Sequence, residues 1–301
     1  MDGPRFDRIV PLVTLVLLGL GVVFLLELNT QLLIVDLGAT LPSFSVAWPL
    51  VGALALLTGI GVELVARGEP QFANSGWQTA VTIGQRHVEL GLPLWSLPML
   101  TPVAVFAFFR LFRGTLATNA YLLVLVATGV LLVTVLIAQH YLIAGTASTA
   151  QRSRGVLAFV AFALAFAIFS AVTFNRYRTL YAIALIFPST LLLAADILRG
   201  RVAALWTTAG IIALIMIEIY WALNYWPAPF WYNSAGLLVV MYVLIGLAHT
   251  AYEDNHPKPA PLAGLTRRGL VEFGIVGGGA LVALAIFAAI ARTQNVELRG
   301  P

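Results

Sequence analysis

The chain has 301 residues, of which 60% are hydrophobic and 10% are charged, and its mean hydropathy is +0.93. Soluble domains carry about 25% charged residues, so this composition excludes a soluble globular protein and predicts apolar helices in lipid. The net charge of +4 comes from arginines scattered between apolar runs, which excludes a nucleic-acid-binding stripe, and the absence of cysteine excludes disulfides and thiolate metal sites.

Nine apolar segments are long enough to cross a bilayer, which takes about 20 residues each. In chain order they are 9–26, 46–66, 92–112, 120–144, 156–174, 179–198, 202–223, 235–252 and 270–291. Pairs of arginines follow or precede several of these segments, as cationic side chains do at membrane boundaries. We predict an all-α fold, a polytopic bundle of transmembrane helices that forms a single membrane domain over residues 1–301, with no soluble domain.

The distribution of Lys and Arg predicts the orientation of the bundle. With the N-terminus in the cytoplasm, 11 of the 17 basic residues fall in segments on the inner side. The third apolar segment contains Pro93, Pro98 and Pro102, and proline interrupts helical hydrogen bonding. If this segment were re-entrant, eight spans would remain; nine spans with a cytoplasmic N-terminus is the prediction that the charges favour.

Two connections are long enough to hold structure of their own. Residues 27–45, on the outer side, contain an apolar patch that we expect to lie along the membrane interface. Residues 67–91, on the inner side, contain Asn74 and Ser75, which could cap a helix, followed by Trp77 and Val81. We expect a short surface helix in this second connection.

Ionisable residues inside apolar segments need an explanation, because burying a charge in hydrocarbon is costly. Glu63 lies four residues before Arg67, and Asp196 lies three residues before Arg199. Both spacings place opposite charges on one helix face. We therefore predict an ion pair near the membrane surface at each of these positions.

Glu218 has no such neighbour, and it precedes an aromatic run near the end of the seventh segment. The run is typical of an aromatic belt at headgroup level. An alternative is an outward-facing cavity with Glu218 at its floor and two arginines able to bind the carboxylate or an anionic ligand. The candidate cavity residues are Glu218, Trp221, Asn224, Tyr225, Trp231, Arg176 and Arg178.

The histidines give a second, weaker pattern. His140 and His249 each lie near the inner end of a predicted helix, so two imidazoles could hold a haem or a metal ion. The sequence has no spaced histidine pair or carboxylate cluster to support that hypothesis. It indicates no catalytic residues, no metal and no cofactor.

The run Tyr220-Trp221-Ala222-Leu223-Asn224-Tyr225-Trp226-Pro227, followed later by Leu265-Thr266-Arg267-Arg268 and Glu272-Phe273, carries a family resemblance. Over this C-terminal third the chain resembles a family of bacterial polytopic membrane proteins known only as a domain of unknown function. The resemblance implies a setting in the bacterial inner membrane, and it implies no activity or site.

Three classes of function are consistent with these features. The favoured one is a non-enzymatic membrane component, such as a subunit, scaffold or partner-binding protein, whose partners are membrane lipids and other membrane-protein subunits. The second is a transporter of a small or lipid-like molecule that uses the cavity around Glu218. The third is a membrane-embedded enzyme acting on a lipid-linked substrate, with Glu218 or Asp36 as acid or base.

Overall fold

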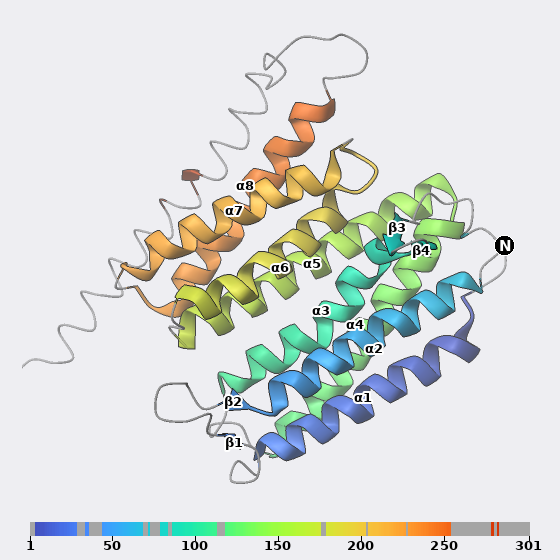
Figure 1. Ribbon diagram of the computed structural model, residues 1–301, viewed down its shortest axis with the longest axis horizontal. Coiled ribbons are helices and arrows are strands. Elements are labelled where there is room, and N and C mark those ends of the chain that lie inside the picture. The colour runs from blue at the N-terminus through green and yellow to red at the C-terminus, as the bar shows by residue number, and fades with distance from the viewer. Residues whose placement is uncertain are drawn as a thin grey trace, which may run out of the picture. The chain divides into compact units, whose positions relative to one another are not determined.

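The computed structural model describes residues 4–28, 34–35, 44–68, 72, 79–83, 86–112, 118–175, 179–202, 204–226, 228–253, 278–279 and 282. This part of the chain contains eight long helices and two short antiparallel hairpins (Figure 1). The helices are α1 (Phe6–Leu28), α2 (Ala47–Arg67), α3 (Leu92–Arg110), α4 (Thr118–Ala144), α5 (Ala147–Asn175), α6 (Thr179–Leu198), α7 (Leu205–Asn224) and α8 (Phe230–Glu253). The chain packs as two compact units, Met1–Leu164 and Ala165–Pro301; a single domain stays a prediction.

Seven of these helices are long and apolar enough to cross a membrane, and Leu94–Arg110 within α3 is a shorter apolar helix. Many large apolar side chains point outward, such as Leu18 at 67% and Leu123 at 72% exposure, which suits a surface in contact with lipid. The chain is therefore a multi-pass membrane protein of helical architecture. The first eight predicted segments are all helical, whereas the ninth, 270–291, lies outside the described residues apart from helical residues 278–279 and 282.

Helix α5 begins nine residues before the predicted position 156, at Ala147. Thr146 accepts hydrogen bonds from the backbone N–H of Ala150 at its carbonyl oxygen (2.8 Å) and from that of Thr149 at its hydroxyl (3.5 Å). This N-cap starts the helix in a polar segment that hydropathy alone does not identify. Arg152 and Arg154 are consequently exposed residues of the helix rather than part of a loop.

In the first unit, α1 to α4 form a ring in which each helix packs against the next (Figure 1). The shared core contains Leu20, Leu94, Phe106 and Leu132, all nearly inaccessible. At the end of the unit formed by the C-termini of α1 and α3, the rings of Trp48 and Phe106 meet edge to face with centroids 5.2 Å apart. The core is thus an apolar helix bundle closed by aromatic residues at one end.

Helix α3 runs the full length of α2 in the opposite direction. Its first turn contacts Glu63 near the C-terminus of α2, and its last residue, Arg110, lies over the Trp48 ring at the start of α2, 5.9 Å from the ring centroid. Arg110 also forms an ion pair with Glu27 on α1, 3.3 Å away. The backbone is helical through Pro98 and Pro102. This end-to-end packing favours an α3 that crosses the membrane and disfavours the re-entrant alternative.

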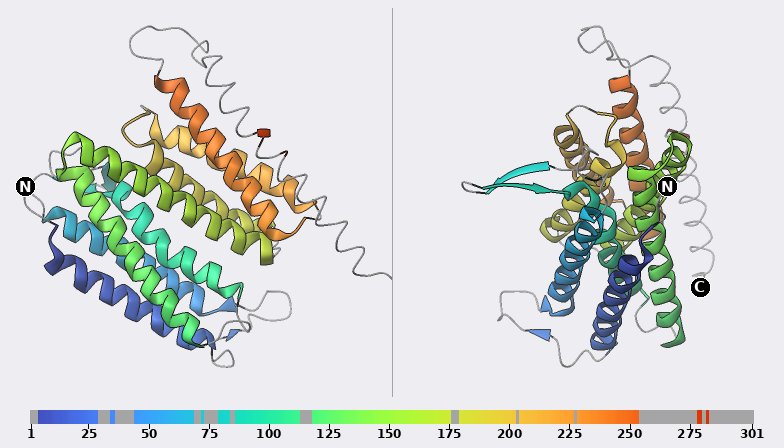
Figure 2. Two further views of the ribbon diagram at one scale, coloured as in Figure 1. Left: turned by 180° about the vertical axis from the view of Figure 1, so that it is seen from behind. Right: turned by 90° about the vertical axis from the view of Figure 1, so that its right-hand side faces the viewer.

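The prediction of a surface helix within residues 67–91 is wrong for the described residues 79–83 and 86–90, which form strands. Strands β3 (Thr79–Ile83) and β4 (Arg86–Leu90) pair antiparallel, with Val81 opposite Val88, and this hairpin projects from the helices in Figure 2. The β-branched residues of β3 and the glycine at position 84 between the strands favour a hairpin over a helix. In the connection between α1 and α2, β1 (Ile34–Val35) pairs with β2 (Phe44–Ser45).

In the second unit, α6 and α8 both pack against α7 and also contact each other. Helix α6 ends in a tight turn: Gly200 has a φ of +69°, and the N–H of Arg201 donates to the Leu198 carbonyl at 3.1 Å. A residue with a side chain would be strained at that φ. The C-terminal part of α5, from Ala165, belongs to this unit and carries Thr173 to its α8 contacts.

Candidate functional site

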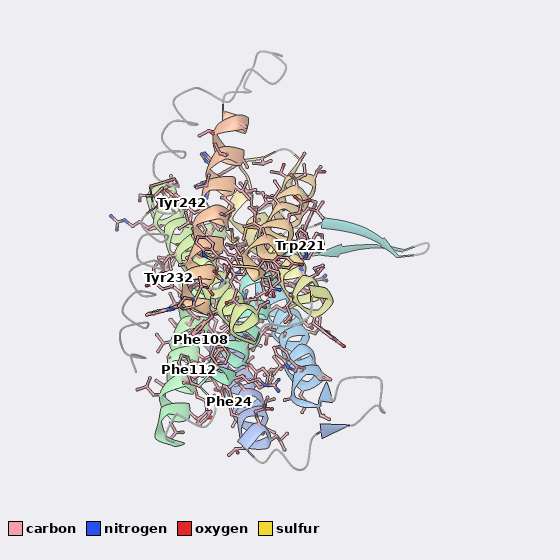
Figure 3. The ribbon with its side chains drawn as sticks, turned by 90° about the vertical axis from the view of Figure 1, so that its left-hand side faces the viewer. Phe24, Phe108, Phe112, Trp221, Tyr232 and Tyr242 are labelled. Atoms are coloured by element: carbon pink, nitrogen blue, oxygen red, sulfur yellow. The ribbon has the colours of Figure 1, made fainter. Side chains whose placement is uncertain are left out.

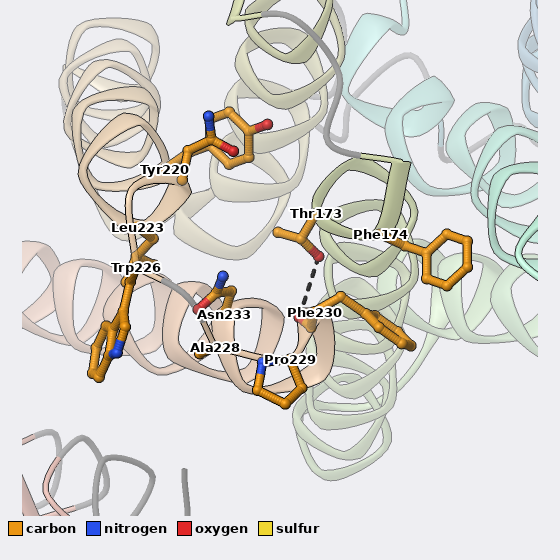
Figure 4. Close-up of a pocket in the computed structure, with 10 residues that line it drawn as sticks. Thr173, Phe174, Tyr220, Leu223, Trp226, Ala228, Pro229, Phe230 and Asn233 are labelled. Atoms are coloured by element: carbon orange, nitrogen blue, oxygen red, sulfur yellow. Dashed lines mark hydrogen bonds between the residues drawn. The ribbon is translucent and has the colours of Figure 1, made fainter. Parts of the chain in front are cut away.

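A cavity of about 200 Å³ lies where α7 ends and α8 begins, with the end of α5 on its third side (Figure 4). Its main lining residues are Thr173 and Phe174 from α5, Tyr220 and Asn224 from α7, and Phe230 and Asn233 from α8. At the chain reversal Tyr225 and Trp226 continue the last turn of α7, and their N–H groups donate to the carbonyls of Ala222 (3.3 Å) and Leu223 (2.9 Å).

Hydroxyl groups fix the α5 side of the cavity to the first turn of α8. The Thr173 hydroxyl lies 2.7 Å from the Ser234 hydroxyl and donates to the Phe230 carbonyl at 3.2 Å, the bond drawn in Figure 4. The Phe174 and Phe230 rings meet edge to face, with centroids 5.0 Å apart. These contacts make one wall of the cavity a packed, preformed surface.

Tyr220 contributes a buried hydroxyl to the residues that line the cavity. Its side chain is 2% exposed, and within the described part of the chain its hydroxyl oxygen has no hydrogen-bond partner. A buried hydroxyl left without a partner costs about 1–3 kcal/mol. In Figure 4, Tyr220 lies across the cavity from Pro229, Phe230 and Asn233.

The structure separates the residues predicted to form a cavity. Asn224 lines the cavity just described. Glu218, Trp221 and Tyr225 are exposed on another face of α7, and Trp231 is exposed on α8. Arg176 and Arg178 lie outside the described residues.

The exposed face of α7 is a regular stripe, which we name the Glu218 face. Its residues are spaced alternately by four and three positions, and all of them are exposed: Thr207, Ile211, Leu214, Glu218, Trp221 and Tyr225. Trp221, labelled in Figure 3, is 52% exposed, and Tyr225, whose ring meets it edge to face, is 71% exposed. The opposite face of α7 carries the buried residues, among them Ala209, Met216 and Tyr220.

Both predicted ion pairs are confirmed. Asp196 binds Arg199 at 2.8 Å, and Glu63 binds Arg67 at 2.6 Å. Just beyond the end of α6, burial lowers the pKa of Arg199, and the nearby Asp196 carboxylate opposes that shift. Glu63, however, is a buried residue that also accepts hydrogen bonds from the Trp95 indole N–H (2.7 Å) and the Gly91 backbone N–H (3.3 Å).

The two histidines proposed as haem or metal ligands fall in different units of the chain. His140 lies on α4, where its ring meets that of Tyr141 with centroids 5.5 Å apart, and His249 lies on α8. Among the described side chains, no three His, Cys, Asp or Glu residues are grouped as metal ligands would be.

The family comparison matches a model described as "Protein of unknown function (DUF5656)" to residues 12–287. The chain belongs to the DUF5656 family. The predicted resemblance to an uncharacterised family is confirmed, and its extent is corrected: the DUF5656 match covers nearly the whole chain, not just the C-terminal third. No curated protein and no solved structure matches the chain.

Sequence analysis did not identify Tyr220, Thr173, Phe230 or Asn233 as site residues. A partial signal was present for Tyr220, because Ala213, Met216 and Tyr220 recur at helical spacing and mark one apolar face of α7. The α5 and α8 residues come from positions far apart in the sequence, and no short motif joins them.

Proposed function

We propose that the chain is a non-enzymatic component of a membrane-protein assembly and that its Glu218 face binds a membrane-spanning helix of a partner protein. One observation carries the proposal: a carboxylate is exposed in the middle of an otherwise mostly apolar helix face. Within the described residues, no hydrogen bond or ion pair reaches Glu218. The bacterial inner membrane is the proposed location, on the family resemblance and the arginine distribution.

The energetics favour a covered rather than a lipid-facing Glu218. A charged side chain at the centre of a membrane helix costs about 2.5–3.5 kcal/mol on insertion scales, and a paired charge avoids much of that cost. The alternating spacing of four and three residues is the pattern with which one helix inserts side chains between those of another. From Thr207 to Tyr225 the stripe is about 27 Å long at 1.5 Å per residue, close to the thickness of a hydrocarbon core.

The charge of Glu218 indicates which kind of helix binds the Glu218 face. A second copy that docked through the same face about a two-fold axis would bring two Glu218 carboxylates together, and like charges repel in a low dielectric. A partner helix with an arginine or lysine at the depth of Glu218 would instead form a charge-assisted hydrogen bond. We therefore commit to a different protein that carries a cationic transmembrane helix.

The other two function classes make demands that involve the same residue. A transporter built on Glu218 needs that side chain in a cavity, and the cavity described above is lined by other residues of α7. An enzyme needs a second ionisable group within reach of Glu218. Asp36, the second acid or base suggested by the sequence, lies outside the described residues, and Glu27 forms an ion pair with Arg110.

Site-specific photocrosslinking in cells of the source organism tests the proposal. A photoreactive amino acid replaces Leu214 on the Glu218 face, and the matched control replaces Tyr242, which is 44% exposed on α8. We expect Leu214 to crosslink to a transmembrane peptide of another protein that contains a basic residue. Glu218→Gln should lower that yield several-fold while expression persists, because a hydrogen bond to a charged group is lost.

Three results would overturn this function. The adduct could join Leu214 to another segment of the same chain, or to a second copy. The yield of the Leu214 adduct could be unchanged in Glu218→Gln, or the captured segment could contain no basic residue. Absence of any Leu214 adduct while the Tyr242 control crosslinks to neighbours would also contradict a partner on the Glu218 face.

A further inference from the structure

The cavity between the ends of α5, α7 and α8 has the chemistry of a binding site for a neutral ligand. Its polar groups are the Tyr220 hydroxyl and the side-chain amides of Asn224 and Asn233, and its walls include the Phe174, Trp226 and Phe230 rings. Among the described lining residues none carries a charge, and Glu218 belongs to a different face of α7.

We infer that this cavity binds an uncharged group bearing several hydroxyls, such as a sugar ring, either as the headgroup of a glycolipid or as a free sugar. The site does not depend on the proposed partner helix, because the two use separate residues of α7.

The absence of charge among the described lining residues favours a neutral ligand over an ion. An ion in a partly buried cavity loses hydration, and without an opposite charge or metal nothing restores that energy. A neutral ligand pays a much smaller desolvation cost, provided that each of its hydroxyls finds a partner.

The arrangement of donors and acceptors suits hydroxyls in particular. Each asparagine amide offers both a donor and an acceptor, as a sugar hydroxyl requires, and the Tyr220 hydroxyl can do either. Tyr220 is 2% exposed and its hydroxyl has no partner among the described residues; after a small shift of the Tyr220 side chain that exposes this hydroxyl to the cavity, a ligand hydroxyl would satisfy a group that the fold leaves unsatisfied. The size of the cavity, about 200 Å³, is below that of sites for drug-sized ligands, which suits one ring rather than an extended chain.

Binding measurements on the purified full chain test the inference. The protein is extracted without glycoside detergents, whose sugar headgroups would compete for the cavity. Lipid nanodiscs with monoglucosyl diacylglycerol, phosphatidylglycerol or phosphatidylcholine are compared by native mass spectrometry, and free glucose is titrated by calorimetry. We expect binding of glucosyl lipid, of free glucose, or of both, and the arm that binds identifies the source of the sugar.

Tyr220→Phe removes only the hydroxyl and should weaken binding about tenfold, the effect of one lost hydrogen bond. Tyr242→Phe is the matched control, since Tyr242 lies on α8, is 44% exposed and does not line the cavity; the sugar affinity of this variant should equal that of the wild type. The melting temperature should not fall in Tyr220→Phe, which separates loss of binding from loss of folding.

Preferential binding of phosphatidylglycerol or phosphatidylcholine, absence of binding by every sugar-bearing probe, or equal affinity of Tyr220→Phe and the wild type would each overturn the inference. Asn233→Ala gives a second readout, because it removes an amide on the opposite wall from Tyr220; unchanged sugar affinity in this variant would likewise contradict a site in the cavity.

Discussion

Glu63 shows how one carboxylate joins two helices at the residue scale. It accepts two hydrogen bonds from Arg67 on its own helix, one from the Trp95 indole and one from the Gly91 backbone. Gly91 precedes the first turn of α3, where the helix dipole favours a negative charge. The Glu63 side chain is 6% exposed, whereas the Arg67 side chain is 51% exposed, so we expect the two partners to contribute unequally to stability.

We predict that Glu63→Gln lowers the free energy of unfolding by about 2 kcal/mol, because donors on α3 lose a charged acceptor. Arg67→Gln should cost less than Glu63→Gln, because the Trp95 and Gly91 bonds to Glu63 remain and the Arg67 end of the ion pair is exposed to solvent. Equilibrium unfolding in detergent micelles measures both. Equal, small losses would mean that Glu63 is only a surface ion-pair partner.

Sequence spacing predicted half of this arrangement. The separation of four residues identifies Arg67 as a partner of Glu63, and the bond is present. Trp95 lies 32 residues away, and its contact depends on how α2 and α3 pack. Gly59, one turn before Glu63, leaves space for the Trp95 ring, which would lie 3.0 Å from an added Cβ. The glycine and the glutamate on one face of α2 do not by themselves predict which aromatic residue packs against that face.

At the scale of elements, α3 shows how a helix tolerates internal proline in a membrane. Pro98 has no N–H, so the Leu94 carbonyl four residues earlier loses its helical partner. The Gln139 side chain of α4 donates to that carbonyl at 3.1 Å. A neighbouring helix thus satisfies a backbone group that proline leaves open, as membrane helices require.

A double-mutant cycle tests this compensation. Gln139→Leu should cost about 1 kcal/mol in the wild-type background, and much less in Pro98→Ala, because alanine restores the N–H that the Leu94 carbonyl accepts. The free energy of unfolding of the four proteins gives the coupling. Additive effects would show that Gln139 contributes to stability through other contacts.

Hydropathy predicted the existence of the helices better than their ends and the short elements between them. The eight described helices coincide with predicted segments because a helix apolar on all sides is hard to mistake. The start of α5 was missed because Thr146 caps the helix within a polar stretch. The β3–β4 hairpin was not predicted because Asn74, Ser75 and the spacing of Trp77 and Val81 also fit a capped helix, whereas the β-branched residues of 79–83 favour a strand.

At the scale of the whole molecule, alternate crossing of the helices determines which residues share a membrane face. With a cytoplasmic N-terminus, the connection between α4 and α5 lies inside, and the connection between α7 and α8 lies outside. The cavity at Tyr220 would then lie near the outer face, and Glu218 would lie in the outer half of its helix. The sequence identified the aromatic run of this region, but not its cavity, whose walls come from three helices.

Cysteine accessibility tests this topology most directly, because the wild-type chain has no cysteine. Single cysteines replace Trp231 at the start of α8 and Ala147 at the start of α5, both of them exposed, and intact cells are treated with a membrane-impermeant maleimide. We expect labelling of Trp231→Cys in intact cells and labelling of Ala147→Cys only after the membrane is permeabilised. Labelling of Ala147→Cys with protection of Trp231→Cys would place the cavity on the cytoplasmic side and contradict the orientation.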